Sequence, residues 1–202
     1  MNTDDDVSRS VRSLRVALAG ASGTGKTTLA RYVSERYGLP INPVGSRSVS
    51  AAMGFASPYD VDAAGKRGEF QRRLQEEKIA WEMAHDSFVT DRTTLDELVY
   101  TMFHDVDTAA GEYYERAVAH MARYDLVFFC PARVFCKVDG DKARRDSMPY
   151  QVLFSDVLGG LFREMGSALN TSWMPLYLSG LDKRQAAVME KVRFFQAIRR
   201  TA

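Results

Sequence analysis

The chain has 202 residues, of which 46% are hydrophobic and 26% charged, proportions typical of one soluble domain with ample material for a core. Its formal net charge of +1 shows neither the strong basicity of an obligate nucleic-acid binder nor a large acidic excess, so charge alone does not choose a partner. Cys130 and Cys136 lack matching cysteine or histidine pairs, which argues against a zinc site or a disulfide framework. No apolar run reaches the roughly eighteen residues of a membrane span, and the acidic N-terminus does not resemble a signal peptide. We therefore expect a cytoplasmic protein with reduced thiols, residues 1–12 forming a solvated tail and residues 13–202 a single domain.

The first predicted element is a buried strand at residues 14–19, and the segment after it fits the phosphate-loop pattern G-x-x-x-x-G-K-[ST] without a mismatch. A helix is predicted over residues 27–37. Backbone N–H groups of such a loop, together with the helix N-terminus, bind phosphate oxygens. We expect Lys26 to contact the β and γ phosphates of ATP and the Thr27 hydroxyl to bind Mg²⁺. The candidate ATP-binding residues are Gly20, Ser22, Gly23, Thr24, Gly25, Lys26, Thr27 and Thr28.

A glycine and a proline end the first helix, and residues 41–44 form a weak second strand. Residues 45–65 lack a clean period, which predicts a loop with short helical pieces. Ligands of open parallel sheets bind outside the carboxyl ends of the strands, so this segment is expected to face the substrate. Arg47 is the candidate substrate-binding residue, with a solvated loop arginine as the alternative interpretation.

Residues 66–85 predict a long amphipathic helix that leads into a strand at residues 87–92. Thr93 and Asp96 have the spacing of a capping box, so a helix begins directly after the strand and Asp96 is mainly structural. Asp91 lies at the carboxyl end of the strand, beside the phosphate loop. It is placed to organise the Mg²⁺ shell or to accept a proton from an attacking hydroxyl, with helix capping as the alternative.

A further helix is predicted over residues 109–124, followed by a strand at residues 126–130 whose continuous apolar character is typical of a central parallel strand. Residues 133–145 carry five basic side chains around a turn. We interpret them as a lid in which Arg144 and Arg145 close over the transferring phosphoryl group, with a solvated charge run as the alternative. A helix at residues 149–168, a strand at 176–178 and a helix after residue 180 complete the chain.

The alternation of strands and helices, with a phosphate loop after the first strand, predicts the fold class. We expect a doubly wound α/β domain with a mostly parallel sheet of five strands and helices on both faces. No internal repeat or low-complexity linker interrupts this pattern.

Three groups of residues together resemble the P-loop kinases of nucleosides and nucleotides. They are the phosphate loop, the element Thr90-Asp91-Arg92-Thr93 with Asp96 and Tyr100 behind it, and the basic stretch at residues 139–145. Within that superfamily the chain is most similar to the group that includes nicotinamide-riboside kinases and phage P-loop kinases of nucleotides or of hydroxymethylated bases in DNA. The resemblance extends from residue 14 to the last helix, and the phosphate loop is its most specific part.

The resemblance implies roles for particular residues. The acid of the Asp-Arg-Thr element serves the metal or the acceptor hydroxyl, which falls on Asp91, and the arginine after it contacts substrate or phosphate, which falls on Arg92. Many deoxynucleoside kinases carry an acidic general base at the end of the second strand, whereas residues 43–46 offer no acid. The base is therefore Asp91 or a later acid such as Asp60 or Asp62. The implied catalytic residues are Lys26, Asp91, Arg92, Arg144 and Arg145.

We expect an ATP- and Mg²⁺-dependent kinase that transfers the γ-phosphoryl group to a nucleoside, a nucleotide or a similar acceptor. One alternative is a kinase of 5-hydroxymethyluracil within DNA, as in phage DNA hypermodification, and another is a regulatory P-loop ATPase. A signalling GTPase is disfavoured because the chain lacks the guanine-reading Asn-Lys-x-Asp. A regulatory ATPase is disfavoured because Arg92, and not a second acid, follows Asp91. The sequence leaves the acceptor and the oligomeric state open.

Overall fold

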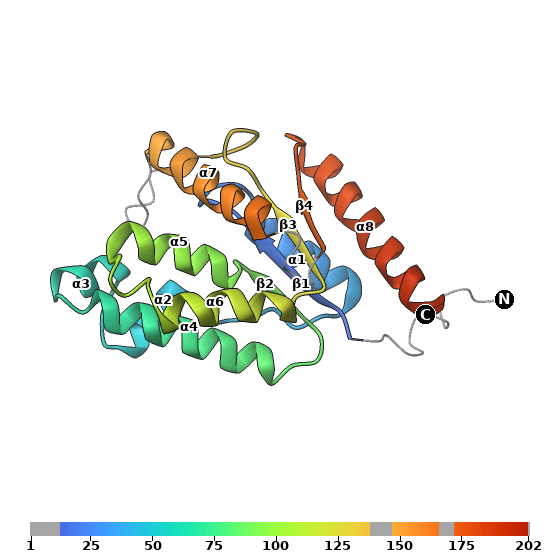
Figure 1. The fold of residues 1–202 in the computed structure, drawn as a ribbon. Helices are drawn as coiled ribbons and strands as arrows, with labels where there is room; N and C mark the ends of the chain where they lie inside the picture. The colour runs from blue at the N-terminus through green and yellow to red at the C-terminus, as the bar shows by residue number, and fades with distance from the viewer. Residues whose placement is uncertain (1–12, 138–146, 166–171, 202) are drawn as a thin grey trace.

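The computed structural model describes residues 13–137, 147–165 and 172–201, and a parallel sheet of four strands lies at their centre (Figure 1). The strands are β1 (Arg15–Ala19), β2 (Phe88–Asp91), β3 (Leu126–Phe129) and β4 (Ser172–Pro175). Their order across the sheet is β2-β1-β3-β4, so β1 has a parallel neighbour on each side. The loop after β1 therefore leaves the middle of the sheet at its carboxyl edge, which is where doubly wound proteins bind ligands.

Helices cover both faces of this sheet (Figure 1). α1 (Lys26–Tyr37) and α8 (Leu181–Thr201) pack on one face, and α5 (Thr94–His104), α6 (Glu112–His120) and α7 (Met148–Met165) pack on the other. α2 (Ser46–Ala52), α3 (Pro58–Ala63) and α4 (Arg67–Met83) share a smaller apolar cluster, and α4 also packs against α5. A 3₁₀ turn, η1 (Met121–Arg123), joins α6 to β3.

Successive residues of the central strand enter different cores. Val16 and Leu18 pack with α1 and α8, whereas Ala17 and Ala19 pack with the helices of the opposite face, and all four side chains are fully buried. Side chains alternate across a strand, so a strand covered on both faces must be apolar at every position. This two-sided burial is the physical reason for the unbroken apolar runs in β1 and β3.

The prediction of five strands is wrong for the residues that the structure describes, because the expected strand at 41–44 is reduced to an isolated bridge. Ile41 forms a parallel bridge with Val89, flanked by hydrogen bonds from Asn42 N to Val89 O (2.8 Å) and from Val89 N to Pro40 O (2.9 Å). Pro40 and Pro43 lack N–H groups and cannot extend this ladder in either direction. The predicted α/β fold, with a parallel sheet covered by helices on both faces, is confirmed.

The last strand lies at Ser172–Pro175 and not at residues 176–178. Pairing with β3 ends where Leu176 N donates to Phe129 O (2.7 Å), and Tyr177 is already exposed. Pro175 pairs with Phe129 at the end of an edge strand, a position that tolerates proline because no further N–H is needed on that side.

The other predicted elements are present with small shifts at their ends. Helices occupy the described parts of the ranges expected at 27–37, 66–85, 109–124, 149–168 and after residue 180, and α2 and α3 are the short helical pieces expected within 45–65. The capping box is confirmed at α5, where Thr93 Oγ1 accepts from Asp96 N (3.2 Å) and Asp96 Oδ2 accepts from Thr93 N (2.9 Å). Cys130 and Cys136 form no disulfide. In the described ranges, no helix combines the length and apolar character needed to cross a bilayer.

Candidate functional site

The phosphate loop connects β1 to α1, and its backbone requires glycine. Gly23 has φ +75°, and a Cβ built on it would lie 2.2 Å from the Lys137 carbonyl oxygen. Both the left-handed conformation and this close approach exclude a side chain at position 23. The segment that follows β3 therefore runs directly over the loop, which Lys137 N reinforces by donating to Gly23 O (2.9 Å).

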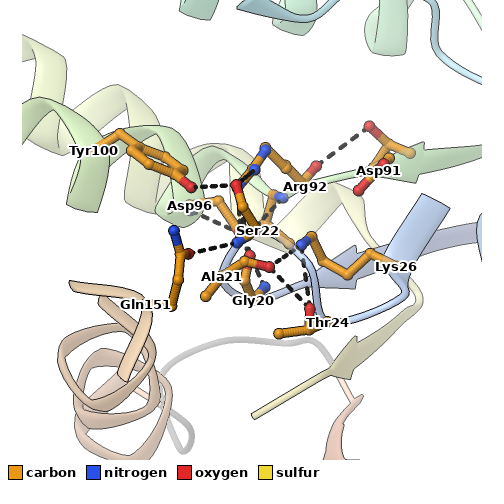
Figure 2. A network of polar contacts seen from close by, with 12 residues as sticks. Gly20, Ala21, Ser22, Thr24, Lys26, Asp91, Arg92, Asp96, Tyr100 and Gln151 are labelled. Carbon is orange, nitrogen blue, oxygen red and sulfur yellow. Dashed lines mark hydrogen bonds and ion pairs between the residues drawn. The ribbon is translucent and has the colours of Figure 1, made fainter. Parts of the chain in front are cut away.

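The N–H groups of the loop fall into two sets (Figure 2). The two at its start have partners in the protein, since Gly20 N donates to Asp96 Oδ1 (2.8 Å) and Ser22 N donates to Gln151 Oε1 (2.9 Å). Across the parts of the chain that the structure describes, the N–H groups of residues 23–25 meet no acceptor. The first turn of α1 adds further N–H groups that have no intrahelical partner. Residues 23–28 thus form a set of donors suited to an anion.

Lys26 lies inside the loop and is only 4% exposed. Its ammonium donates to Ala21 O and lies 3.3 Å from Thr24 Oγ1 (Figure 2). Burial, reinforced by the positive charge of Arg92, lowers the pKa of Lys26 from 10.5 to about 8. The lysine is therefore a desolvated cation held within the phosphate loop.

Thr27 and Asp91 bring two oxygen ligands together beside the loop. Thr27 Oγ1 donates to Asp91 Oδ2, while Asp91 Oδ1 is buried and has no hydrogen-bond partner in the described ranges. Burial alone would raise the pKa of Asp91, but Lys26, Arg92 and the Thr27 hydroxyl outweigh it and hold the pKa below its ordinary value. An ionised carboxylate with an unused oxygen next to a hydroxyl fits Mg²⁺, which takes few protein oxygens and completes its shell with water and phosphate. The described ranges contain no cluster of three or more aspartate, glutamate, histidine or cysteine side chains that could hold a metal ion.

Arg92 follows Asp91 and has φ +96°, an unusual conformation for a residue with a side chain. Its guanidinium packs over the Tyr100 ring at 4.7 Å and donates to Ser22 Oγ (3.1 Å) and Gly20 O (3.4 Å). Asp96 Oδ1 lies 3.8 Å away. Arg92 therefore supports the start of the phosphate loop and also lines the cleft beside it. The strained turn aims this side chain at the loop.

The loop opens into a cleft of about 810 Å³, within the range of small-molecule sites. Its wall includes Lys26, Thr27 and Asp91 as well as Arg47 and Tyr59 from the region of α2 and α3. The structure thus places the predicted metal, phosphate and substrate residues along one cavity. Arg47 is exposed, and Tyr59 is half-buried.

Sequence reasoning missed three groups on the wall of this cleft. Glu97 on α5 is 5% exposed, and burial raises the pKa of its carboxyl. Gln151, from α7, supports the loop through Ser22. Tyr150 packs on Phe103 and contacts His104 Nε2 (3.3 Å). These groups lie on helices that are distant from the phosphate loop in the sequence, and no local motif marks them. The one usable signal was the position of Glu97, one turn inside the helix that follows the Asp-Arg-Thr element.

The remaining candidates have other surroundings. Arg144 and Arg145 lie outside the described residues. Asp60 is exposed at the start of α3, where it accepts from Ser57 Oγ (2.9 Å), and Asp62 lines the cleft but pairs with Arg67 at 3.0 Å. Trp81 on α4 packs against Phe88 at the core, whereas Tyr59 lines the cleft.

A family model described as an AAA domain matches residues 15–172, which include β1, the phosphate loop, β2 and β3. The chain belongs to the AAA domain family. No relative was found among curated protein sequences. The match covers both the Lys26 loop and the Asp91 strand end, so these parts of the site lie inside the segment that the family model matches.

Solved structures resemble this AAA domain along most of its length. The NadR protein in complex with NR matches at a TM-score of 0.68 and 17% identity, over 92% of this chain and 50% of that one. Deoxyadenosine kinase from M. mycoides, with products dCMP and dCDP bound, matches at 0.57 and 13% identity, over 89% and 98%. Shikimate kinase from Aquifex aeolicus matches at 0.57 and 15% identity, over 89% and 96%. At these identities the likeness establishes the fold, and it confirms the predicted resemblance to P-loop kinases at that level.

Proposed function

We propose that this AAA domain is an ATP-dependent kinase that transfers the γ-phosphoryl group to a nucleoside- or nucleotide-like acceptor. The observation that carries the proposal is that one cleft contains both the phosphate-binding groups and a second set of polar and aromatic side chains, including Glu97 and Tyr59. A hydrolase needs room for a nucleotide and a water molecule. A cleft of about 810 Å³ with a buried acid in its wall provides room for a second substrate.

In this proposal the protein positions and neutralises the reacting phosphates. The transfer forms a bond from the acceptor oxygen to the γ phosphorus and breaks the bond to the oxygen of ADP, and the acceptor proton passes to solvent water after the transition state. The N–H groups of residues 23–28 and the Lys26 ammonium hold the β and γ phosphates. Thr27 and Asp91 would hold Mg²⁺, which when bound neutralises charge on the phosphate oxygens. Arg92 keeps the loop in place and adds positive charge beside it.

The opposite pKa shifts of Asp91 and Glu97 suit these two acids to different roles. The lowered pKa of Asp91 makes it a weak base and suits metal binding, and the loose transition state of phosphoryl transfer needs little early deprotonation. The raised pKa of Glu97 and its burial in the cleft suit a carboxyl that meets hydroxyl or amino groups of the acceptor. We assign acceptor binding to Glu97 and Arg47.

A regulatory ATPase is the second candidate, and the AAA description of the family favours it. Against it, the strand end offers a single acid, Asp91, and the next side chain is the loop-supporting Arg92. The structural neighbours include deoxyadenosine and shikimate kinases, and the ligands bound to them and to NadR include deoxynucleotides, shikimate and NR. The variety of these ligands supports a small acceptor without identifying it. A hydroxymethylated DNA base is the alternative acceptor to be tested.

The test is a phosphotransfer screen with γ-labelled ATP and Mg²⁺. Acceptors are nucleosides, nucleoside monophosphates, nicotinamide riboside, shikimate and DNA that contains 5-hydroxymethyluracil, and Lys26→Met is the inactive control. We expect label to move to one class of acceptor, with little ATP turnover in its absence. ATP hydrolysis at the same rate with and without every acceptor would identify an ATPase.

A further inference from the structure

The carbonyl groups at the start of the phosphate loop all have hydrogen-bond donors. Each of the five carbonyl oxygens from Gly20 to Thr24 accepts a hydrogen bond from another part of the chain or from a side chain of the loop. The donors are, in order, Arg92, Lys26 together with Thr24 Oγ1, Cys136, the backbone of Lys137, and Arg184. The loop therefore directs its carbonyls toward the protein, while residues 23–25 keep N–H groups that meet no acceptor in the described ranges.

Arg184 is the most distant of these donors in the sequence. It lies in the first turn of α8, 160 residues after Thr24, and its Nη1 donates to Thr24 O at 2.7 Å. The side chain is only 3% exposed and its guanidinium packs over the Phe135 ring at 4.7 Å. A buried, stacked guanidinium is held in one orientation, so its donor reaches Thr24 without a large loss of side-chain entropy.

The position of Arg184 also bears on Gly25. A Cβ built on Gly25 would lie 3.3 Å from Arg184 Nη2 and 3.4 Å from Nη1, closer than such contacts normally are. The guanidinium thus packs directly against the peptide that joins Thr24 to Gly25. The three heavy atoms nearest to that Cβ position all belong to this guanidinium.

The hydrogen bond from Arg184 to Thr24 O also fixes the orientation of the Gly25 N–H, because both groups belong to one peptide bond. The C=O and N–H of a trans peptide point in opposite directions. When Arg184 holds Thr24 O, the Gly25 N–H of the same peptide points away from Arg184 and stays available to an anion. Without that anchor the peptide can rotate, and the loop presents a carbonyl where it should present a donor.

We propose that Arg184 is a positioning residue for the phosphate loop and that it sets the affinity of the loop for the phosphates of the nucleotide. The inference rests on the proposed function only for the identity of the ligand. It requires no contact between Arg184 and the nucleotide, and no acceptor.

The experiment compares the binding of ADP with Mg²⁺, by calorimetry, in the wild type, Arg184→Met and Arg184→Lys. Arg193→Met, at an exposed position of the same helix, is the matched control. Loss of a hydrogen bond from a charged donor typically changes a binding constant by about tenfold or more. We therefore expect Arg184→Met to raise the Kd at least about tenfold, Arg184→Lys to raise it about threefold because one donor remains, and Arg193→Met to leave it unchanged.

A role limited to packing would lower the Tm without changing the Kd of the folded protein, and a Kd for Arg184→Met within about twofold of the wild type would overturn the proposal. If Arg184→Met does not fold, Arg184→Lys decides, and an unchanged Kd in that variant overturns it. These outcomes differ from a failure of the proposed function, in which the wild type itself does not bind ADP with Mg²⁺ or binds it as well when Lys26 is replaced by methionine.

Discussion

Replacing Lys26 with methionine is expected to remove phosphotransfer and, at neutral pH, to stabilise the protein in the absence of nucleotide. Burial lowers the pKa of this lysine from 10.5 to about 8, so the folded protein binds the proton more weakly than the unfolded chain. At about 1.4 kcal/mol per pKa unit, keeping the ammonium charged in the folded state costs about 3 kcal/mol. Methionine keeps the length and packing of the side chain without the charge.

The difference in the free energy of unfolding between Lys26→Met and the wild type depends on pH. Below about pH 8 the lysine is charged in both states and the cost is fully present. As the pH rises from about 8 toward 10.5 the folded protein releases the proton first, and the cost disappears. The lost contacts to Ala21 O and Thr24 Oγ1 offset about 1 kcal/mol of the gain, which leaves about 2 kcal/mol in favour of the variant at pH 7.

The assay is urea unfolding of both proteins without nucleotide at pH 7, 8.5 and 10. All other titrating groups are common to the two proteins, so the difference in the free energy of unfolding isolates Lys26. Lys183→Met, at an exposed position of α8, is the matched control. A Lys26 variant that is less stable at pH 7, by an amount that does not change with pH, would refute the reasoning.

Three further variants probe the site and its support. Asp91→Asn should lower the rate at ordinary Mg²⁺ and recover near wild-type rate at high Mg²⁺, whereas a rate that stays low with the same Mg²⁺ dependence would exclude the metal role. Glu97→Gln should raise the KM for the acceptor about tenfold and leave that for ATP unchanged; equal changes in both would argue against acceptor binding. Burial alone would raise the pKa of Glu82, but Lys78 and His120 lower it to about 2. Glu82→Gln should therefore lower the free energy of unfolding at pH 7 by about 3 kcal/mol. That deficit should shrink in urea titrations as the pH falls from about 4.5 toward 2, where wild-type Glu82 also becomes neutral. A deficit that is constant with pH would contradict an ionised Glu82 stabilised by Lys78 and His120.

The parts of the site that could be predicted from the sequence are those fixed by short-range geometry. The spacing of the phosphate loop placed Lys26 and Thr27, and an acid at the end of an apolar strand placed Asp91 beside them. The capping box correctly gave Asp96 a structural role, but its second contact, from Gly20 N, joins residues 76 positions apart and left no local trace. The same holds for Gln151 and Arg184, which contact the loop from α7 and α8.

The errors in the fold also have a physical cause. Strand ends depend on which N–H and C=O groups find partners, and prolines act differently at edges and in the middle of a sheet. Pro40 and Pro43 limited one predicted strand to a bridge at Ile41, while Pro175 ended a real edge strand that the sequence placed a few residues later. Propensity alone does not distinguish these cases.

The central claim, that the phosphoryl group passes to an acceptor bound in the same cleft, is tested most directly by ³¹P NMR of the reaction with the acceptor identified by the screen. The account predicts that ADP and a new phosphorylated product appear in equal amounts, that inorganic phosphate stays near its level in the Lys26→Met control, and that ATP persists when the acceptor is omitted. Inorganic phosphate formed in step with ADP, with no phosphorylated acceptor, would contradict it.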